Sequence, residues 1–270
     1  MHANLMREIG WRVEGSLGSE IFYRPLGPVS VAKLQRPQAI DLDWLAHFRN
    51  SHHTLTTYIE PGLSTILPDQ KLGFKVEPFA HSATSLVDLH PLESKLLASF
   101  SQKTRYNIVR TLKKNDLHVT TTTLGNLTNS QLNQFFALHN SWSRQKHVLG
   151  YSVTHLQAVL KCFAHHGDLH LAYQDNILVG SLLILYHDSV STYWAAFATN
   201  EGYNLYAPTL LTWVAMQRAK ECGCDIFDFG GIYDPRYPQI YKRWQGFTKF
   251  KEGFRPTVVA YPPTYLKLFW

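Results

Sequence analysis

Apolar and polar residues alternate along the chain in short, distinct segments. Runs rich in β-branched and aromatic residues predict strands at residues 21–23, 55–59, 85–89, 118–123, 169–174, 178–187, 190–199 and 225–229. Apolar residues at helical spacing predict helices at residues 40–50, 93–100, 102–114, 129–142, 154–164 and 208–221. Residues 1–14 read as a short helix or arm, and residues 61–82 as a long loop.

The order of these elements indicates a fold class. From residue 117 onward the order is strand, helix, helix, three strands, helix and strand, with a final strand near Val258. This order resembles that of a GNAT-type acyltransferase. We therefore predict an α/β (α+β) protein with at least one such domain.

The composition is that of a globular protein with a substantial core. The chain has 270 residues, of which 45% are hydrophobic. Its longest apolar run, Ile177 to Tyr186, contains Gly180 and Ser181 and reads as a buried strand, too short to span a membrane. The N-terminus has no apolar signal segment, and three cysteines cannot form a disulfide framework. We expect a cytoplasmic protein, with peripheral association at the inner membrane face as a further expectation.

Basic residues gather in one segment. Lys103, Arg105, Arg110, Lys113 and Lys114 lie together, no acidic residue occurs between Ser94 and Asn115, and the whole chain carries a formal charge of +6. A local positive field of this kind favours an anionic partner such as RNA, although a generally basic composition explains it equally well. The predicted RNA-binding residues are Lys103, Arg110, Lys113 and Lys114.

The stretch from Asp225 to Phe254 contains the candidate catalytic group. A strand that ends at Gly230-Gly231 is followed by a polar loop and then by the sequence FKEGF. A lysine between two aromatic residues can lose water and present a fixed cation to the oxyanion formed in acyl transfer. The alternative is that Lys251 is a solvated lysine on a β-turn.

Four segments stand out along the chain: YRPLGPV from Tyr23, YIEP from Tyr58, LLASFSQKTRYNIVRTLKKNDLHV from Leu96, and DFGGI followed by FKEGF. In this order they resemble the motifs of the FemA, FemB and FemX family of peptidoglycan-bridge aminoacyl transferases. The resemblance implies two GNAT-like domains, a reduced N-terminal one at residues 1–95 and a C-terminal one at residues 96–270. The coiled-coil arm of FemA and FemB is missing, because nothing between Asn115 and Asn129 could form it.

The resemblance also implies a reaction. Such a protein forms an amide between an aminoacyl group from aminoacyl-tRNA and an amine of a peptidoglycan precursor, either a UDP-MurNAc-peptide or lipid II. It needs no organic cofactor. Adjacent histidine pairs such as His52-His53 also lack metal-ligand spacing, so we expect no metal site.

Residue roles follow from the matched motifs. Lys251 would stabilise the tetrahedral intermediate. Glu60 would take a proton from the attacking amine or orient it, with a solvated turn residue as the alternative. For Asp228, structural pairing with Lys251 or Arg243 is an alternative to substrate contact. The predicted substrate-binding residues are Phe250, Arg105, Tyr106, Arg144, Tyr151, Tyr206 and Asp228.

Two other functions remain open from the sequence. A coenzyme-A-dependent N-acyltransferase would carry a glycine-rich pyrophosphate loop, whereas the matching stretch, residues 200–207, has one glycine and the bulky Tyr203. A non-catalytic protein that binds RNA or cell wall is the second alternative, favoured by the short first domain. The acceptor contacts are also in question, because residues 150–154 depart from the family's arginine and tyrosine pattern.

Overall fold

The chain divides into two compact units. The computed structural model describes residues 1–16, 18–114 and 117–268. The first unit comprises residues 1–84, 234–241 and 259–270, and the second comprises residues 85–233 and 242–258. Both units are discontinuous in sequence. The two units differ from the predicted domains, which have a single boundary between residues 95 and 96, and that domain division stays a prediction.

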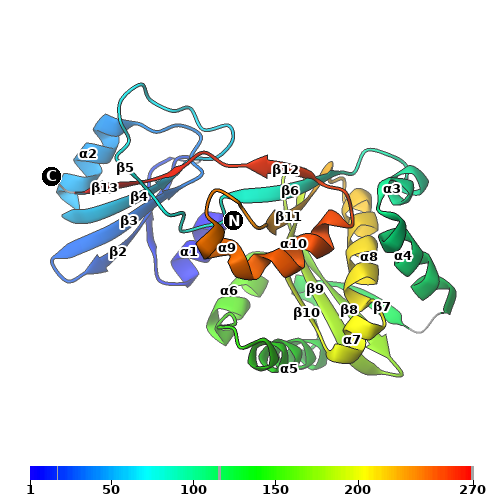
Figure 1. The fold of residues 1–270 in the computed structure, drawn as a ribbon. Coiled ribbons are helices and arrows are strands. Elements are labelled where there is room, and N and C mark those ends of the chain that lie inside the picture. Colours follow the sequence, from blue (N-terminus) through cyan, green and yellow to red (C-terminus); the bar gives the residue numbers. More distant parts are fainter. Residues whose placement is uncertain (17, 115–116, 269–270) are drawn as a thin grey trace. The chain divides into compact units, whose positions relative to one another are not determined.

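The first unit is built on a six-stranded sheet (Figure 1). Its strands lie in the order β1 (Arg12–Glu14), β2 (Ile21–Leu26), β3 (Val29–Gln35), β4 (Thr54–Glu60), β13 (Thr264–Leu268) and β5 (Phe74–Val76). Helix α1 (His2–Glu8) precedes the sheet, and α2 (Leu42–Ser51) joins the parallel strands β3 and β4. Leu45 and Phe48 of α2 pack with Ile21, Leu34 and Ile59 in one core.

The second unit contains a seven-stranded sheet. Its strands lie in the order β12 (Thr257–Ala260), β6 (Ala83–Asp88), β11 (Ile226–Gly231), β10 (Val190–Ala198), β9 (Ile177–His187), β8 (Gly167–Gln174) and β7 (His118–Thr123). Strands β7 to β10 form an antiparallel meander, whereas β10 and β11 are parallel. The chain passes from one unit to the other within β6, after residue 84, and within β12, after residue 258.

Helices cover both faces of this second sheet. Gly180 on β9 faces Ala207 and Leu211 of α8. Phe197 on β10, whose strand partner is the adjacent Ser181, packs against Phe135 of α5. Neighbouring strand residues point to opposite faces, so α8 and α5 lie on opposite sides of the sheet. The helices of the second unit are α3 (Glu93–Ser99), α4 (Gln102–Lys114), α5 (Asn129–Lys146), α6 (Val153–Cys162), α7 (Asn200–Asn204), α8 (Ala207–Glu221) and α10 (Gln245–Glu252), with short 3-10 turns at Leu124–Asn126 and Lys242–Trp244. Helix α9 (Pro238–Tyr241) belongs to the first unit.

The predicted fold class is confirmed, and most predicted elements are present. The order from β7 to β11 is the one expected, and Thr128 caps α5 through a capping box with Gln131. Within the described residues, the longest helix is α5, at 18 residues, and no coiled-coil arm is formed.

Several elements differ from the sequence-based expectation. Strands β3, β5 and β13 fall in segments with no predicted element or with a predicted loop, and helix α7 lies where the pattern predicts a loop. The pattern before Lys251 predicts a polar loop ending in a turn, but this segment forms α9 and α10. The β-turn alternative for Lys251 is therefore wrong.

Candidate active site

Strand β11 and helix α10 position Lys251. Aromatic side chains fix the strand, because Phe227 and Phe229 are fully buried in the core of the second unit. Helix α10 turns Thr248 and Lys251 inward. The hydroxyl of Thr248 accepts a 2.8 Å hydrogen bond from the backbone N–H of Tyr233, which ties the helix to the chain just after β11.

The ammonium group of Lys251 is held by the end of β11. The side chain is 6% exposed, and its Nζ donates to the carbonyl oxygens of Phe229 at 2.8 Å and Gly231 at 2.7 Å. The rings of Phe247 and Tyr193 lie 4.7 Å and 5.8 Å from the same nitrogen. An ammonium has three N–H donors, and two of them are used in these hydrogen bonds.

Sequence reasoning missed both rings around Lys251. Phe247 lies four residues before Lys251 and shares its helix face, so recognition of α10 would have found it. Tyr193 comes from the neighbouring strand β10, and only sheet pairing brings it close.

The surroundings of Lys251 bring the pKa of its ammonium close to physiological pH. Burial lowers its pKa from 10.5 to about 8, and the nearby Asp228 carboxylate partly opposes this shift. Burial also raises the pKa of Tyr193, so that ring stays a neutral phenol. Lys251 is therefore mainly protonated at pH 7 but loses its charge only slightly above that pH.

Asp228 and Phe250 lie beside Lys251 in different roles. The Asp228 carboxylate accepts a 2.7 Å hydrogen bond from the N–H of Gly230, which shapes the end of β11, and it acts on Lys251 through charge. Phe250 points to the core, where its ring lies 5.4 Å from that of Phe254. Both remain proposed substrate residues without a structural test.

Glu60 lies at the end of β4 in the first unit. It is buried, and its Oε1 accepts hydrogen bonds from the N–H groups of Phe79 at 3.0 Å and Ala80 at 2.7 Å. Its Oε2 is buried without a hydrogen-bond partner among the described residues. The solvated-turn alternative for Glu60 is therefore wrong, and its catalytic role stays a proposal.

Two of the proposed acceptor contacts border the segment between α5 and α6. Tyr151 is stacked on Trp194 of β10, with ring centroids 4.6 Å apart, and the His155 ring lies 5.3 Å from Tyr151 and 6.0 Å from Trp194. Arg144 is exposed on α5, where its Nε donates to the carbonyl of Asn140. No sequence signal points to Trp194, because its partner Tyr151 is distant along the chain.

Helix α4 presents a mixed face. Thr104, Asn107, Ile108 and Thr111 are buried, which leaves Lys103, Lys113, Lys114 and Tyr106 exposed. Val109 and Leu112 are exposed beside them. The predicted basic face is therefore interrupted by apolar side chains.

Two arginines of α4 have internal partners. Nη1 of Arg105 donates to the carbonyl oxygens of Ala98 and Phe100, so this side chain caps α3. The guanidinium carbon of Arg110 lies 5.3 Å from the ring of Tyr206. Tyr206 in turn sits at the N-cap of α8 in a left-handed conformation. The three residues thus tie α4 to its neighbours, and their substrate roles stay proposals.

The stretch compared with a coenzyme-A loop forms helix α7. Three N–H groups of this stretch are paired: that of Gly202 with the Thr199 hydroxyl, that of Tyr203 with the Thr199 carbonyl, and that of Leu205 with the Glu201 carbonyl. A side chain at Gly202 would meet the Val179 carbonyl at 2.1 Å, so this glycine serves close packing rather than an open loop.

Arg236, in the basic segment that leads to Lys251, is part of a structural network in the first unit. It forms an ion pair with the buried Asp234 at 2.7 Å and donates to the carbonyl oxygens of Ser82 and Tyr261. The Ser82 hydroxyl also donates to Asp234. The network joins three segments that are far apart in sequence, which is why sequence patterns could not find it.

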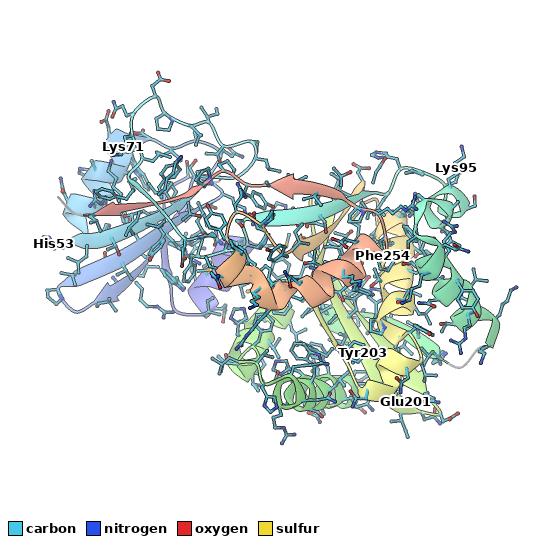
Figure 2. All side chains as sticks on the ribbon, viewed as in Figure 1. His53, Lys71, Lys95, Glu201, Tyr203 and Phe254 are labelled. Atoms are coloured by element: carbon cyan, nitrogen blue, oxygen red, sulfur yellow. The ribbon has the colours of Figure 1, made fainter. Side chains whose placement is uncertain are left out.

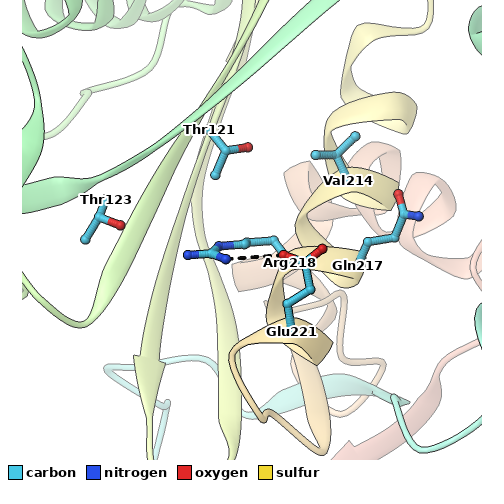
Figure 3. A pocket seen from close by; sticks show the side chains of 6 residues that line it. All are labelled: Thr121, Thr123, Val214, Gln217, Arg218 and Glu221. Atoms are coloured by element: carbon cyan, nitrogen blue, oxygen red, sulfur yellow. Dashed lines mark hydrogen bonds and ion pairs between the residues drawn. The ribbon is translucent and has the colours of Figure 1, made fainter.

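A separate recess of about 480 Å³ lies between β7 and α8. Figure 3 shows its six lining side chains, Thr121, Thr123, Val214, Gln217, Arg218 and Glu221, with Arg218 paired to Glu221. Arg218 also pairs with the buried Asp168 at 3.0 Å. These groups satisfy one another, and none of the predicted site residues lines this recess.

Other site types are not supported by the described residues. Within residues 1–16, 18–114 and 117–268, no group of three or more His, Cys, Asp or Glu side chains could hold a metal ion. Over the same ranges, no helix is both long enough and apolar enough to cross a bilayer.

The sequence profile of the FemAB family matches residues 156–266, a range that includes β11, α10 and Lys251. The resemblance to the FemABX family is confirmed. Together with the acyltransferase fold, this supports a Fem-type transferase. A search of curated protein sequences finds no match to this Fem-like chain.

Solved structures show the same fold. A FemX crystal structure superposes with a TM-score of 0.79 at 14% identity, over 99% of this chain and 90% of that one. The C-terminal domain of a putative lysylphosphatidylglycerol synthetase from Agrobacterium fabrum gives 0.66 at 16% identity, over 99% and 86%. The L-PGS structure from Bacillus licheniformis gives 0.64 at 14% identity, over 98% and 86%. At these identities the likeness concerns the fold alone.

Proposed function

We propose that this protein is an aminoacyltransferase that joins an aminoacyl group, carried by aminoacyl-tRNA, to an amine of a peptidoglycan-precursor peptide. The observation that carries the proposal is the buried Lys251 ammonium, held by two carbonyl oxygens. A preorganised cation in a water-poor setting is what a developing oxyanion needs. The family match over residues 156–266 supports the same reaction class.

The proposed reaction has a simple balance of bonds. The acceptor amine attacks the ester carbonyl carbon, which forms a C–N bond and places negative charge on the carbonyl oxygen. The remaining N–H of Lys251 donates to that oxygen. Collapse breaks the C–O bond to the tRNA, whose ribose hydroxyl gains the proton that the amine releases. Glu60 is the carboxylate proposed, from its motif, to accept that proton in passing.

The hydrogen bonds of α7 favour a tRNA-linked donor over acyl-coenzyme A. Enzymes that bind coenzyme A use free backbone N–H groups between a strand and a helix to hold its pyrophosphate. Here the N–H groups of Gly202, Tyr203 and Leu205 are paired internally. The ring of Tyr203, labelled in Figure 2, is also held against α5. Trp142 donates to its hydroxyl, and the Lys146 ammonium lies over its face.

The decisive experiment is a transfer assay. Purified protein is incubated with a mixture of radiolabelled aminoacyl-tRNAs and with either a UDP-MurNAc-peptide or lipid II. We expect label in the precursor, and none after treatment of the donor with ribonuclease. Transfer that survives ribonuclease, or that requires acetyl-coenzyme A, would replace this proposal with the coenzyme-A alternative.

A further inference from the structure

The segment between α5 and α6 exposes an unusual number of apolar side chains. Leu149 is 104% exposed, and Val148, Tyr151 and Val153 are also exposed. We call residues 147–153 the α5–α6 tip. Figure 1 shows this segment where the chain leaves the end of α5 and turns into α6. Clustered apolar side chains of this kind on a folded surface mark an interaction site.

The tip is held in place at its first half. His147 has a left-handed conformation with a φ of 51°, and the N–H groups of His147 and Val148 donate to the carbonyls of Arg144 and Ser143. A side chain at Gly150 would meet the Ser143 hydroxyl at 2.3 Å and His139 at 2.5 Å. Gly150 has no side chain, so the chain passes close to the Ser143 and His139 side chains of α5 here, and the adjacent Leu149 is fully exposed.

The second half rests on an aromatic base. The Tyr151 ring is stacked on Trp194 at 4.6 Å with an interplanar angle of 21°, and His155 lies beside both rings. Tyrosine and tryptophan combine an apolar ring with a polar atom, which suits them to the boundary between hydrocarbon and water.

The surroundings of the tip are positively charged. No Asp or Glu occurs from Leu117 to Gly167, a range that contains both α5 and α6. Arg144 and Lys146 are exposed at the end of α5 beside the tip. The acid on the adjoining α7 is Glu201, which Figure 2 labels. Its neighbour Asn200 accepts a hydrogen bond from the side chain of Gln145 on α5. One carboxylate does not balance the two cations.

We propose that the α5–α6 tip is a docking surface for an anionic lipid bilayer. Such a bilayer offers both complements at once: acidic headgroups for Arg144 and Lys146, and hydrocarbon for Leu149 and Val148. A second copy of the chain fits less well, because a two-fold contact would bring like charges together. Arg144 and Tyr151 are also proposed acceptor contacts, but vesicle binding is measured without any substrate, so the docking proposal and the transferase proposal can fail separately.

The test is flotation of the purified full chain with lipid vesicles. We expect binding to vesicles made of phosphatidylglycerol and phosphatidylcholine, weak binding to phosphatidylcholine alone, and a decrease with added salt. Leu149→Glu should lower the partition coefficient about tenfold or more, since one buried leucine is removed. Arg144→Gln and Lys146→Gln should each lower it about fivefold.

The matched control is Ile177→Glu. Ile177 is also a well-exposed apolar residue, at 68%, but it lies on the β8–β9 hairpin just after Asp175. This variant should bind vesicles like the wild type. All variants should keep the wild-type melting temperature, because the replaced side chains are exposed.

Three outcomes would overturn the proposal. The first is unchanged vesicle binding by Leu149→Glu. The second is an equal loss in Ile177→Glu, which would show a general effect of added negative charge. The third is a wild-type dimer in sedimentation velocity that Leu149→Glu dissociates, without vesicle binding by the wild type. That result would assign the tip to self-association.

Discussion

The Nζ atom of Lys251 on α10 donates a 2.7 Å hydrogen bond to the carbonyl oxygen of Gly231 at the end of β11. With the second bond, to Phe229, this interaction fixes a cation at the carboxyl end of β11, an interior strand of the sheet in the second unit. Both hydrogen bonds are donated by the side chain of Lys251, so a substitution there removes the cation and these bonds but leaves the backbone of the helix intact.

Lys251→Met should lower turnover about a hundredfold, the usual effect of losing one oxyanion donor. Methionine keeps the length and apolar stem of lysine, so the fold should remain. The measurement is initial rate in the transfer assay, with circular dichroism as a check of folding. Lys249→Met is the matched control, since Lys249 is exposed on the same helix and should be silent. Near-normal activity of Lys251→Met would remove this residue from the mechanism.

The low pKa of Lys251 predicts how the rate depends on pH. Burial brings the pKa to about 8, and only the protonated form can stabilise an oxyanion. The rate should therefore fall as pH rises through about 8. Single-turnover rates measured from pH 6.5 to 9.5 would test this, with ester hydrolysis in the absence of protein subtracted. A rate that keeps rising to pH 9.5 would mean that the ammonium is not required.

The same shift predicts a change in stability with pH. The folded pKa of Lys251 is about 8 and the unfolded value is 10.5, so the unfolded chain binds more protons between these values. Stability from this group should rise with pH across that window, by an amount on the order of 3 kcal/mol. Urea unfolding at pH 8 and at pH 10 should show the rise in wild type and a smaller one in Lys251→Met. Identical pH slopes in the two proteins would contradict the assignment.

The ion pair of Asp234 and Arg236 predicts that a substitution here lowers the stability of the fold. Burial alone would raise the pKa of Asp234, but hydrogen bonds from Arg236 and Ser82 outweigh it and hold the pKa below its usual value. Asp234→Asn should destabilise the protein by about 2–3 kcal/mol, because hydrogen bonds to a charged group are lost. Asp69→Asn, at an exposed position, should be neutral. Equal unfolding midpoints for the two variants would show that the network contributes nothing.

Sequence patterns predicted the second sheet well because its strands are apolar and its helices are clearly capped. They failed for β3 for a physical reason. On Val29–Gln35 the buried positions include Ser30 and Ala32, whereas Val29 and Val31 are half-buried, so the usual contrast between faces is reversed. Strand β13 gains its place from pairing with β4, which no local pattern can show.

From the sequence, a residue of the candidate site could be predicted only if it stands in a short recognisable motif. Lys251 stands in FKEGF, and this motif makes it a candidate, but its helix is not predicted because QGFTKFKE contains a glycine, a β-branched threonine and two phenylalanines. The rings around its ammonium depend on that helix and on strand pairing. Network residues such as Asp234 have no signature at all, since their partners come from three distant segments.

The paired N–H groups of α7 predict that acetyl-coenzyme A does not bind. Gly202 and Tyr203 have no free donors for a pyrophosphate. Calorimetric titration of the wild type should give no saturable heat at micromolar protein. Saturable binding, abolished in a variant of Thr199, would instead promote the coenzyme-A-dependent acyltransferase.

The exposed cations of α4 predict a binding face for a polyphosphate, and we expect the acceptor stem of tRNA to be that ligand. At 100° per residue, Lys103, Arg110 and Lys114 lie within one narrow stripe, and Lys113 lies to its side. The structure changes the choice of residues to test, because Arg110 packs over Tyr206 whereas Lys113 and Lys114 are exposed. Each lysine that binds a phosphate releases counterions, so affinity for tRNA should fall steeply with salt.

The test compares two variants of equal charge change. Lys113→Gln combined with Lys114→Gln should weaken tRNA binding and flatten the slope of log affinity against log salt by roughly 0.7–0.9 for each phosphate that is no longer neutralised. Lys71→Gln combined with Lys75→Gln removes two exposed cations of the first unit and should leave that slope unchanged. Neither variant should shift the melting temperature, since exposed charges contribute little to stability. If both variants weaken tRNA binding equally, the interaction follows total charge, and α4 is an ordinary solvated helix face.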